Sequence, residues 1–273
     1  MTTPLSLADY NSYITAFAQS IPATIERLSE ITNGRVAPAV ADLSIGSARK
    51  VTAAVIFFDI RGFTRRTSSS QIEELKKTLF MLNCVIPSMM RVLFRHGAYV
   101  EKNTGDGLMA ILGVGDDAAT IASKALSACA EMLFVLDDIV NPVLQQYGIE
   151  RVDARVGVDL GEILLARIGV PRGAANHDRS SLTAVGPAAN IACKLQGMAG
   201  TNEIFCGDRL LAGESLLGRA FFVDVTPPDW TWVYSNGGAR YSCWRYSRRA
   251  TRPTPPTILG GGLLGGWMPR PVG

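Results

Sequence analysis

The sequence has few residues from which a zinc site or a disulfide framework could be built. It contains only two histidines, His96 and His177, and its five cysteines are scattered without a Cys-x-x-Cys pair. An odd, unpatterned set of cysteines in a chain of 273 residues is typical of buried thiols in a reducing compartment. The composition therefore argues against a structural zinc centre and against a secreted domain held together by disulfides.

The chain also has little excess of charge of either sign. It contains 27 lysine and arginine residues against 24 aspartate and glutamate residues, for a net charge of +3. Nucleic-acid binding calls for a concentrated basic stripe. The basic excess lies partly in a cluster near the C-terminus, which we interpret as a solvated tail: Arg245, Arg248, Arg249 and Arg252. We therefore expect no nucleic-acid partner.

Long apolar runs and targeting signals are missing as well. Asp, Arg, Lys or Gln interrupts each apolar stretch before it reaches the length needed to span a membrane. The N-terminus lacks the basic and apolar regions of a secretory signal. We therefore expect no membrane partner and a cytoplasmic location.

What the sequence does have is enough apolar material for one complete core, because 47% of its residues are hydrophobic. We expect a helical segment over residues 1–34, a linker over 35–50, one domain over 51–246 and a disordered tail over 247–273. The first segment carries apolar residues at helical spacing, and two roles fit it equally well. It packs on a second subunit, or it extends the core.

Strand-like and helix-like patterns alternate within the domain. The expected helices cover residues 71–94, with a bend at Pro87, 116–147, with a break near Pro142, and 185–198. The expected single strands cover 51–58, 203–206 and 221–225. The expected hairpins pair 98–100 with 108–112, 152–158 with 163–168 through Gly161, and 230–234 with 240–246. This order favours an α/β fold, specifically an α+β sandwich with helices covering one side of the sheet.

Two acidic residues stand where strands end beside flexible backbone. The apolar run 51–58 ends in Asp59, and Asp106 lies in a glycine-flanked turn between two strand-like segments. A strand-end cap and an ordinary turn residue are the simplest explanations for each aspartate alone. Together, two carboxylates beside turns whose N–H groups can face an anion suit a pair of divalent cations on a polyphosphate. The pattern predicts a site for a nucleoside triphosphate.

Three blocks of sequence, in this order and at this spacing, resemble the signatures of the class III nucleotide cyclases. They are residues 58–64 (F-D-I-R-G-F-T), 102–106 (K-N-T-G-D) and 183–194 (T-A-V-G-P-A-A-N-I-A-C-K). The resemblance runs from about residue 51 to residue 246. It implies a ferredoxin-like βαββαβ core with a C-terminal hairpin. It also implies an enzyme that forms a 3′,5′-cyclic nucleotide and releases pyrophosphate.

The resemblance implies roles for the first two blocks. In the family, two Mg²⁺ or Mn²⁺ ions lie between two aspartates and the triphosphate. Asp59 and Asp106 match those aspartates, and the backbone carbonyl of Ile60 matches a further metal ligand. The backbone N–H groups near Gly62, Phe63 and Thr64 would hold the β- and γ-phosphates, and a side chain at Gly62 would block their approach.

The third block implies two catalytic residues on one helix face, Asn190 and Lys194. In the family, the asparagine orients the ribose and the second residue stabilises charge on the transferred phosphoryl group. That second residue is normally arginine. Lysine keeps the positive charge but lacks the planar guanidinium group that can form two hydrogen bonds with phosphate oxygens at once. The alternative for Lys194 is a solvated helix lysine.

The choice of base has two interpretations. Lys102 and Thr183 match positions that read the purine edge in adenylate-forming relatives, which favours ATP. The residues of the three blocks, taken together, instead resemble the sequences of the stand-alone bacterial pyrimidine cyclases of the Pycsar anti-phage system. The resemblance includes lysine in place of arginine at position 194. Those proteins make cyclic UMP or cyclic CMP upon infection, for a separate effector that senses the product. This resemblance favours UTP, slightly ahead of CTP.

The resemblance also implies a homodimer, because the family's active sites form between two chains. One chain supplies the metal aspartates, and the other supplies the base-reading and Asn190/Lys194 face. Two further hypotheses compete with an active cyclase: a degenerate cyclase fold that senses a nucleotide, and a polymerase relative. The sequence argues against a polymerase relative, because it offers no basic groove and is too short for the domains that would surround a polymerase site. Outside the site, we expect Asp159 to be structural and Trp230, Trp232 and Trp244 to cover core or dimer surface.

Overall fold

The computed structural model describes residues 32–33, 43–102, 105–170, 179–234 and 237–251 of the chain. The part of the expected helical segment 1–34 that precedes residue 32, and the part of the expected tail 247–273 that follows residue 251, lie outside these ranges. So do Asn103 and Thr104 of the second sequence block, and Asn236 of the last expected turn. The boundaries proposed for the domain and the tail stay predictions, although the first long strand already begins at Ala48, inside the segment expected to be a linker.

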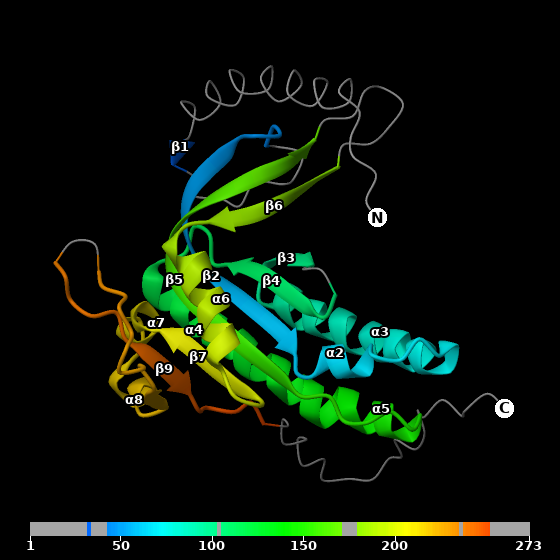
Figure 1. The fold of residues 1–273 in the computed structure, drawn as a ribbon. Helices are drawn as coiled ribbons and strands as arrows, with labels where there is room; N and C mark the ends of the chain where they lie inside the picture. The colour runs from blue at the N-terminus through cyan, green and yellow to red at the C-terminus, as the bar shows by residue number, and fades with distance from the viewer. Residues whose placement is uncertain (1–31, 34–42, 103–104, 171–178, 235–236, 252–273) are drawn as a thin grey trace, which may run out of the picture.

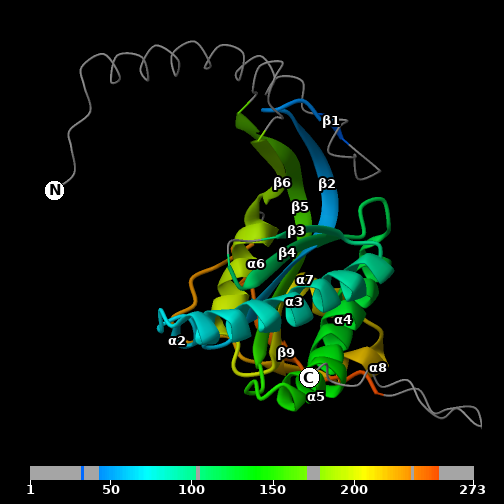
Figure 2. The ribbon, with the colours of Figure 1, turned by 90° about the vertical axis from the view of Figure 1, so that its right-hand side faces the viewer.

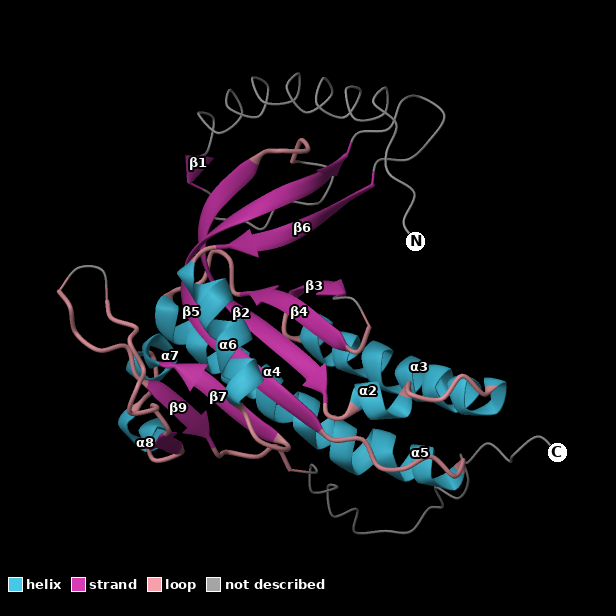
Figure 3. Ribbon diagram, in the orientation of Figure 1, coloured by secondary structure: helices cyan, strands magenta, loops and turns pink. Residues whose placement is uncertain are grey.

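Nine strands in the described residues form a single sheet (Figures 1 and 3). The main order is β3-β4-β2-β5-β7-β9-β8, with β1 paired to β2 and β6 paired to β5. All neighbouring pairs are antiparallel except β1–β2 and β5–β7. The strands are β1 (Thr32–Asn33), β2 (Ala48–Ile60), β3 (Tyr99–Lys102), β4 (Gly107–Leu112), β5 (Ala154–Val170), β6 (Arg179–Val185), β7 (Glu203–Gly207), β8 (Phe222–Asp224) and β9 (Cys243–Tyr246).

Helices cover the two faces of this sheet unequally (Figure 2). One face packs on a layer of long helices, and the other carries α6; these are called the helix-layer face and the α6 face below. The expectation of helices on one side only is therefore corrected by α6. The helices are α2 (Phe63–Arg66), α3 (Ile72–Arg95), α4 (Ala118–Val135), α5 (Asn141–Gln146), α6 (Pro187–Met198), α7 (Asp208–Ala212) and α8 (Leu216–Arg219).

The central pair of strands, β2 and β5, is longer than the sequence pattern predicts. β5 runs without interruption from Ala154 to Val170 and pairs with β2 along the whole length of that strand. The predicted hairpin through Gly161 is wrong, because Gly161 sits inside the strand, opposite Ala53. A Cβ atom at Gly161 would lie 2.9 Å from the Arg209 Nη1 atom, so this glycine provides space for packing rather than a turn. The second half of β5 pairs with β6 instead.

The helix-layer face holds the largest apolar core. Alternate residues of β2, among them Ile56, Phe58 and Ile60, meet buried side chains of α3 and α4. α3 continues through Pro87. The break expected near Pro142 is a π-helical segment, Leu136–Val140, which passes directly into α5. A π turn inserts an extra residue without ending the helix, so the helical axis continues past the proline.

Two helical segments are long and apolar enough to cross a membrane by length and composition alone, Ile72–Arg95 and Ala118–Gln146. The expectation that no stretch reaches that length is corrected for these two segments. Both contribute buried side chains to the core on the helix-layer face, as the core helices of a folded domain do. Their composition is therefore weak evidence for a membrane location.

The remaining expected elements are present with small shifts. The hairpin expected around residues 98–112 is β3 and β4, and α6 begins at Pro187 because Val185 ends β6. The last expected hairpin is present in a short form. It has the isolated bridge of Val233 with Arg240, and the Tyr241 N–H donates to the Trp232 carbonyl oxygen at 2.9 Å. The rest of its second half, β9, pairs with β7 and β8.

Candidate active site

The two predicted metal-binding acids lie at neighbouring ends of two paired strands. The antiparallel register of β2 and β4 sets Asp59 opposite Gly107. The Ile60 N–H donates a hydrogen bond to the Asp106 carbonyl oxygen at 3.3 Å, which joins the two turns. Burial, and after it the charge of Asp59, raises the pKa of the Asp106 carboxyl group. The two carboxylates are therefore close enough to interact, as a pair that shares cations must be.

A third charged residue, Arg155, belongs to this site and was not predicted. It faces Asp59 across the β2–β5 ladder, and its Nε atom lies 2.9 Å from the Asp59 Oδ2 atom. Its Nη1 atom also donates to the Gly197 carbonyl oxygen, at 3.3 Å, and so reaches the last turn of α6. Only the pairing register of β2 with β5 could have placed this arginine next to Asp59. The sequence pattern instead predicts a hairpin that turns at Gly161, and therefore does not predict this register.

The acids present fit divalent cations that arrive with a phosphate substrate. Mg²⁺ keeps several water ligands and is typically bound through one or two carboxylates together with substrate phosphates. Across the described ranges, no group of three or more histidine, cysteine, aspartate or glutamate side chains forms a closed metal site. Burial and the neighbouring Asp59 raise the pKa of Asp106 although Arg155 lies beside the pair, and a bound cation would favour the ionised form of both acids. The Ile60 carbonyl as a further ligand stays a prediction.

The turn expected to hold the phosphates follows directly after Asp59. Gly62 has a φ angle of 69°, a left-handed conformation that favours glycine, and it begins the short helix α2. Phe63 packs its ring against the core on the helix-layer face, while Thr64 is exposed. The phenylalanine is therefore an anchor for the turn, and only its backbone is free to meet a ligand.

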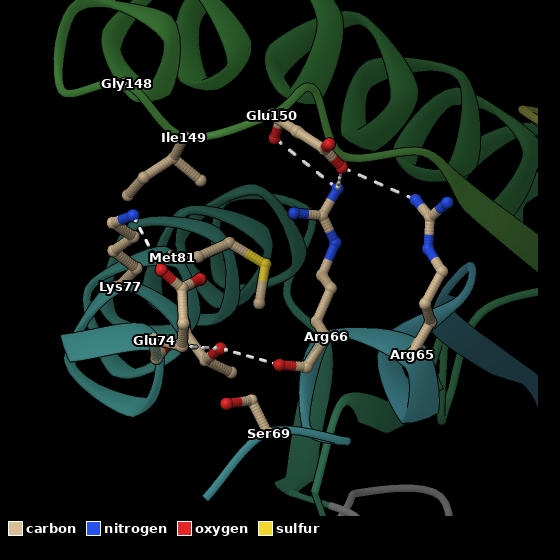
Figure 4. Close-up of a pocket in the computed structure, with 10 residues that line it drawn as sticks. Arg65, Arg66, Ser69, Glu74, Lys77, Met81, Gly148, Ile149 and Glu150 are labelled. Atoms are coloured by element: carbon tan, nitrogen blue, oxygen red, sulfur yellow. Dashed lines mark hydrogen bonds and ion pairs between the residues drawn. The ribbon is translucent and has the colours of Figure 1, made fainter. Parts of the chain in front are cut away.

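α2 is clamped to the chain that leads into β5. The Arg66 Nη2 atom donates to the Arg151 carbonyl oxygen at 2.7 Å, and the Arg66 carbonyl oxygen accepts from the Thr78 hydroxyl at 3.3 Å. Figure 4 shows Arg65 and Arg66 both reaching toward Glu150 across a pocket of about 450 Å³. The remaining basic residue of the pocket, Lys77, pairs with Glu74 at 2.8 Å. The basic groups of this pocket are thus paired with acidic side chains. We therefore interpret the pocket as part of the structure that holds the phosphate turn in place.

Two other predicted residues meet in a cleft on the α6 face. Thr183 from β6 and Asn190 from α6 line a cavity of about 390 Å³ together with Phe57, Glu101 and Cys193. Asn190 and Cys193 are exposed, and Thr183 is half-buried. Of Lys102, the structure describes the backbone, which pairs with Leu108 between β3 and β4. The base-reading role of Lys102 and Thr183 stays a prediction.

Lys194 shares the exposed side of α6 with Asn190 but does not line this cleft. Its ammonium group lies over two indole rings, 4.8 Å from the centre of the Trp230 ring and 5.2 Å from that of Trp232. The alternative expected for Lys194 was a lysine surrounded only by solvent, and the two ring contacts show that it also has protein partners. The charge is solvent-accessible and is also held by an aromatic pair.

The predicted site residues thus form two groups within one chain. The first group is the acid pair with Arg155 and the Gly62 turn, and the second is the Thr183/Asn190 cleft with Lys194 beside it. Neither Asp59 nor Asp106 lines the cleft. The described part of a single chain therefore holds the pieces of a site without joining them.

Comparison with known proteins gives this arrangement a family. Residues 45–207, more than half of the chain, match the family model described as the adenylate and guanylate cyclase catalytic domain. The chain is similar to an adenylate cyclase from Anabaena cylindrica, at 26% identity over 65% of the chain and 32% of the relative. It is similar to a cytidylate cyclase from Escherichia coli, at 26% identity over 57% of the chain and 34% of that protein.

The chain thus spans about a third of the length of the curated relatives that it matches. Its fold is similar to that of the guanylyl cyclase Cya2, with a TM-score of 0.60 at 19% identity, over 76% of this chain and 96% of the other. The expected βαββαβ cyclase fold is confirmed by this likeness. On the family model and the fold, the chain belongs to the class III nucleotide cyclases, the family of adenylate and guanylate cyclase catalytic domains.

Proposed function

We propose that the protein is a nucleotide cyclase that converts a nucleoside triphosphate into a 3′,5′-cyclic nucleotide and pyrophosphate. The observation that carries the proposal is the acid pair, Asp59 and Asp106, held side by side at the ends of β2 and β4. In this reaction the ribose 3′ oxygen bonds to the α-phosphorus, the bond from that phosphorus to the bridging oxygen breaks, and the hydroxyl proton passes to solvent. Two divalent cations, Mn²⁺ or Mg²⁺, bound at the acid pair would polarise the α-phosphate and help ionise the 3′ hydroxyl.

The chain's own residues would bind and orient the substrate around that centre. The backbone N–H groups after Gly62 would hold the β- and γ-phosphates, because the left-handed glycine leaves the turn open to an anion. The Asn190 amide would orient the ribose. The Lys194 ammonium group would stabilise negative charge that develops on the transferred phosphoryl group.

A second copy of the chain is needed to complete the site. The acid pair and the Thr183/Asn190 cleft are separate groups in one chain, and both belong to the α6 face. A twofold homodimer would set the acids of one protomer against the cleft of its partner, at two equivalent positions. We therefore propose that the active form is a homodimer with shared active sites.

For the substrate we propose a pyrimidine nucleotide, UTP slightly ahead of CTP, in a cytoplasmic antiviral signalling role. Support comes from the resemblance of the three sequence blocks to pyrimidine cyclases and from Lys194 in place of arginine. A cytidylate cyclase among the relatives is further support. The product would be sensed by a separate effector. ATP is the alternative, supported by Lys102 and Thr183 and by the adenylate cyclase among the relatives.

The test is to incubate the purified chain with Mn²⁺ and each of ATP, GTP, CTP and UTP, and to identify products by mass spectrometry. We expect one cyclic pyrimidine nucleotide. Asp59→Asn and Asp106→Asn should each lower turnover by more than about 100-fold, since loss of even an outer partner of a metal ligand costs about 10- to 100-fold. The matched control is Asp116→Asn, an acid that also follows a glycine but pairs with Lys124 away from the site. No cyclic product from any triphosphate would reject the proposal.

Mixing two inactive variants tests the shared site. Asp59→Asn and Asn190→Ala each damage a different half, so a mixed dimer has one intact site and one doubly damaged site. After mixing in equal amounts, activity should return to about a quarter of the wild-type value, as random twofold pairing dictates. Complementation that fails while both variants are dimeric by analytical ultracentrifugation would contradict a site shared between chains.

The second candidate is a degenerate cyclase that senses a nucleotide without turnover. Lysine at position 194 motivates it, because that residue lacks the fork with which arginine grips phosphate. Nucleotide binding by calorimetry with no product would favour this sensor. Turnover that is lost in Lys194→Ala would exclude it.

A further inference from the structure

We propose that Trp230 and Trp232 are positioning residues for Lys194: together they hold its ammonium group where the transferred phosphoryl group needs a positive charge. The proposal rests on the proposed cyclase function, which gives Lys194 its task. It adds two residues, from the segment between β8 and β9, that the three sequence blocks do not contain.

The contact itself is a double cation–π interaction. The two indole rings are stacked, with centres 5.2 Å apart and an angle of 29° between their planes. The Lys194 Nζ atom lies 4.8 Å from one centre and 5.2 Å from the other. Both distances are within the range of about 6 Å in which a ring attracts a cation, and indole is the best of the aromatic rings for this.

This contact compensates for the flexibility of lysine, which arginine at this position would not have to the same degree. An arginine side chain carries a planar, pre-organised fork, whereas lysine carries a point charge on a flexible stem. Ordering a free lysine costs side-chain entropy, because its long stem has many rotamers. Rings that hold the ammonium group in place beforehand have already met part of that cost, so less is lost when negative charge develops on the phosphoryl group in the transition state.

The rings themselves are fixed through Tyr241. The Trp230 Nε1 atom donates to the Tyr241 carbonyl oxygen at 2.8 Å, and the Tyr241 N–H donates to the Trp232 carbonyl oxygen at 2.9 Å. The Tyr241 hydroxyl donates to Asp159, a fully buried carboxyl group on the α6 face of β5. A chain of contacts therefore runs from the central strand to the Lys194 charge.

Arg209 strengthens the base of this chain. Its guanidinium lies over the Tyr234 and Tyr241 rings, at 5.4 and 5.3 Å from their centres, and its Nη1 atom donates to the Leu160 carbonyl oxygen. Trp230 and Tyr241 are also nearly fully buried among apolar residues of α6. The rings beneath the lysine are thus held in place by hydrogen bonds and by packing against α6.

The test uses Trp232, because it is half-buried and its replacement is less disruptive than that of Trp230. With whichever triphosphate the wild type turns over, Trp232→Leu should lower kcat about 5-fold, the size of a cation–π contact of about 1 kcal/mol. KM should stay within about 2-fold, because the contact acts on charge that develops in the transition state. Trp232→Phe keeps a ring and should recover most of the loss.

Two controls separate positioning from packing. Lys194→Ala should leave only a low residual kcat, and in that background Trp232→Leu should not lower the residual kcat further, whereas a packing defect would add to the first loss. The matched control is Phe221→Leu, which removes another cation–π contact, with Arg248 at 5.5 Å, and should leave kcat unchanged. An active wild type whose kcat is unaffected by Trp232→Leu, or that falls equally in both backgrounds, would overturn the proposal.

A readout that does not need turnover distinguishes this proposal from the proposed function. In protein labelled with ¹³C-lysine, the Lys194 ε-carbon, assigned with Lys194→Arg, should carry a ring-current shift that Trp232→Leu reduces, because the Trp230 ring remains. A ring-current shift in a protein that makes no cyclic product would reject the cyclase and, with it, the catalytic task, while the contact would stand. Turnover without the shift would overturn the positioning role alone.

Discussion

The two faces of the central strand β5 are made of different kinds of residue over the first half of the strand, residues 154–161. On the helix-layer face, Ala154, Val156, Val158 and Leu160 are all buried in the large apolar core. On the α6 face, the alternate positions are Arg155, Gly157, Asp159 and Gly161. One face is continuous hydrocarbon, and the other holds charges separated by glycines. A single strand thus supplies the core with one set of alternate residues and the site with the other.

The glycines on the α6 face set how closely α6 approaches. A Cβ atom at Gly157 would lie 2.2 Å from both the Ala192 carbonyl oxygen and the Gln196 nitrogen. Backbone atoms cannot give way as a flexible side chain does, so the helix is seated directly on the strand. Along residues 154–161 of β5, the helix-layer face contributes to the core, whereas the α6 face fixes the place of α6 and of the charged groups around it. Farther along the strand, Ile163 and Leu165 of the α6 face join a second apolar core.

The sharpest test of this comparison uses two adjacent phenylalanines of β2. Phe58 points into the helix-layer core and is 1% exposed, whereas Phe57 lies on the α6 face and lines the Thr183/Asn190 cleft. Phe58→Ala should destabilise the protein by about 3–5 kcal/mol through lost burial and a residual cavity. Phe57→Ala should cost much less stability but reduce dimerisation or activity.

Urea denaturation of both variants, with sedimentation of the second, measures these effects. Equal losses of folding free energy from the two substitutions would break the distinction between the faces. Phe57→Leu serves as a milder control that keeps an apolar side chain in the cleft.

A smaller effect is expected from the one buried amide of the helix layer among the described residues, Asn141. Its Nδ2 atom donates to the Val152 carbonyl oxygen at 2.9 Å, and its Oδ1 atom accepts from the Val152 N–H at 2.8 Å. Asn141→Ala leaves both backbone groups of Val152 without their partner, which should cost about 2–4 kcal/mol. Asn83→Ala, on the exposed side of α3, is the matched control and should stay within about 0.5 kcal/mol. Comparable denaturation midpoints for the two variants would show that the Asn141 amide does not stabilise the attachment of the helix layer to the segment that leads into β5.

The last expected effect is a change of stability with pH, which comes from the buried carboxyl group of Asp159 on the α6 face. Burial raises the pKa of Asp159 to about 7, against the hydrogen bond from Tyr241, which lowers it. Because the unfolded value is about 3.9, the folded protein keeps a proton between about pH 4 and pH 7 that the unfolded chain has lost. Stability should therefore fall as pH rises through this window, with a slope on the order of 1 kcal/mol per unit.

Asp159→Asn isolates this contribution, since it keeps an acceptor for the Tyr241 hydroxyl but does not titrate. Denaturation midpoints measured from about pH 5 to pH 8 should decline less steeply in the variant than in the wild type. Other groups titrate in the same window, so the difference between the two curves is the quantity that matters. Parallel curves would mean that Asp159 is ionised in the folded protein throughout.

The sequence predicted the acid pair and most elements because those signals are local. Asp59 and Asp106 are each flanked by a recognisable strand end and a glycine, and the α3, β3–β4 and α6 patterns have clear periods. The α6 face was harder to foresee, because it depends on pairing. Gly161 inside β5 gives the same local pattern as a turn, and Arg155 gains its meaning only from the β2–β5 register. The contact of Lys194 with Trp230 and Trp232 joins segments that no short-range pattern links.

The exposure of Cys193 gives the cleft a practical property. Of the five cysteines, this is the exposed one, and burial raises the thiol pKa of Cys129, Cys206 and Cys243. A maleimide dye should therefore attach first at Cys193, on the same helix as Asn190 and at the wall of the cavity. The chain thus carries a built-in attachment point for a fluorophore, whose emission would report in real time when a partner molecule or a nucleotide closes over that wall.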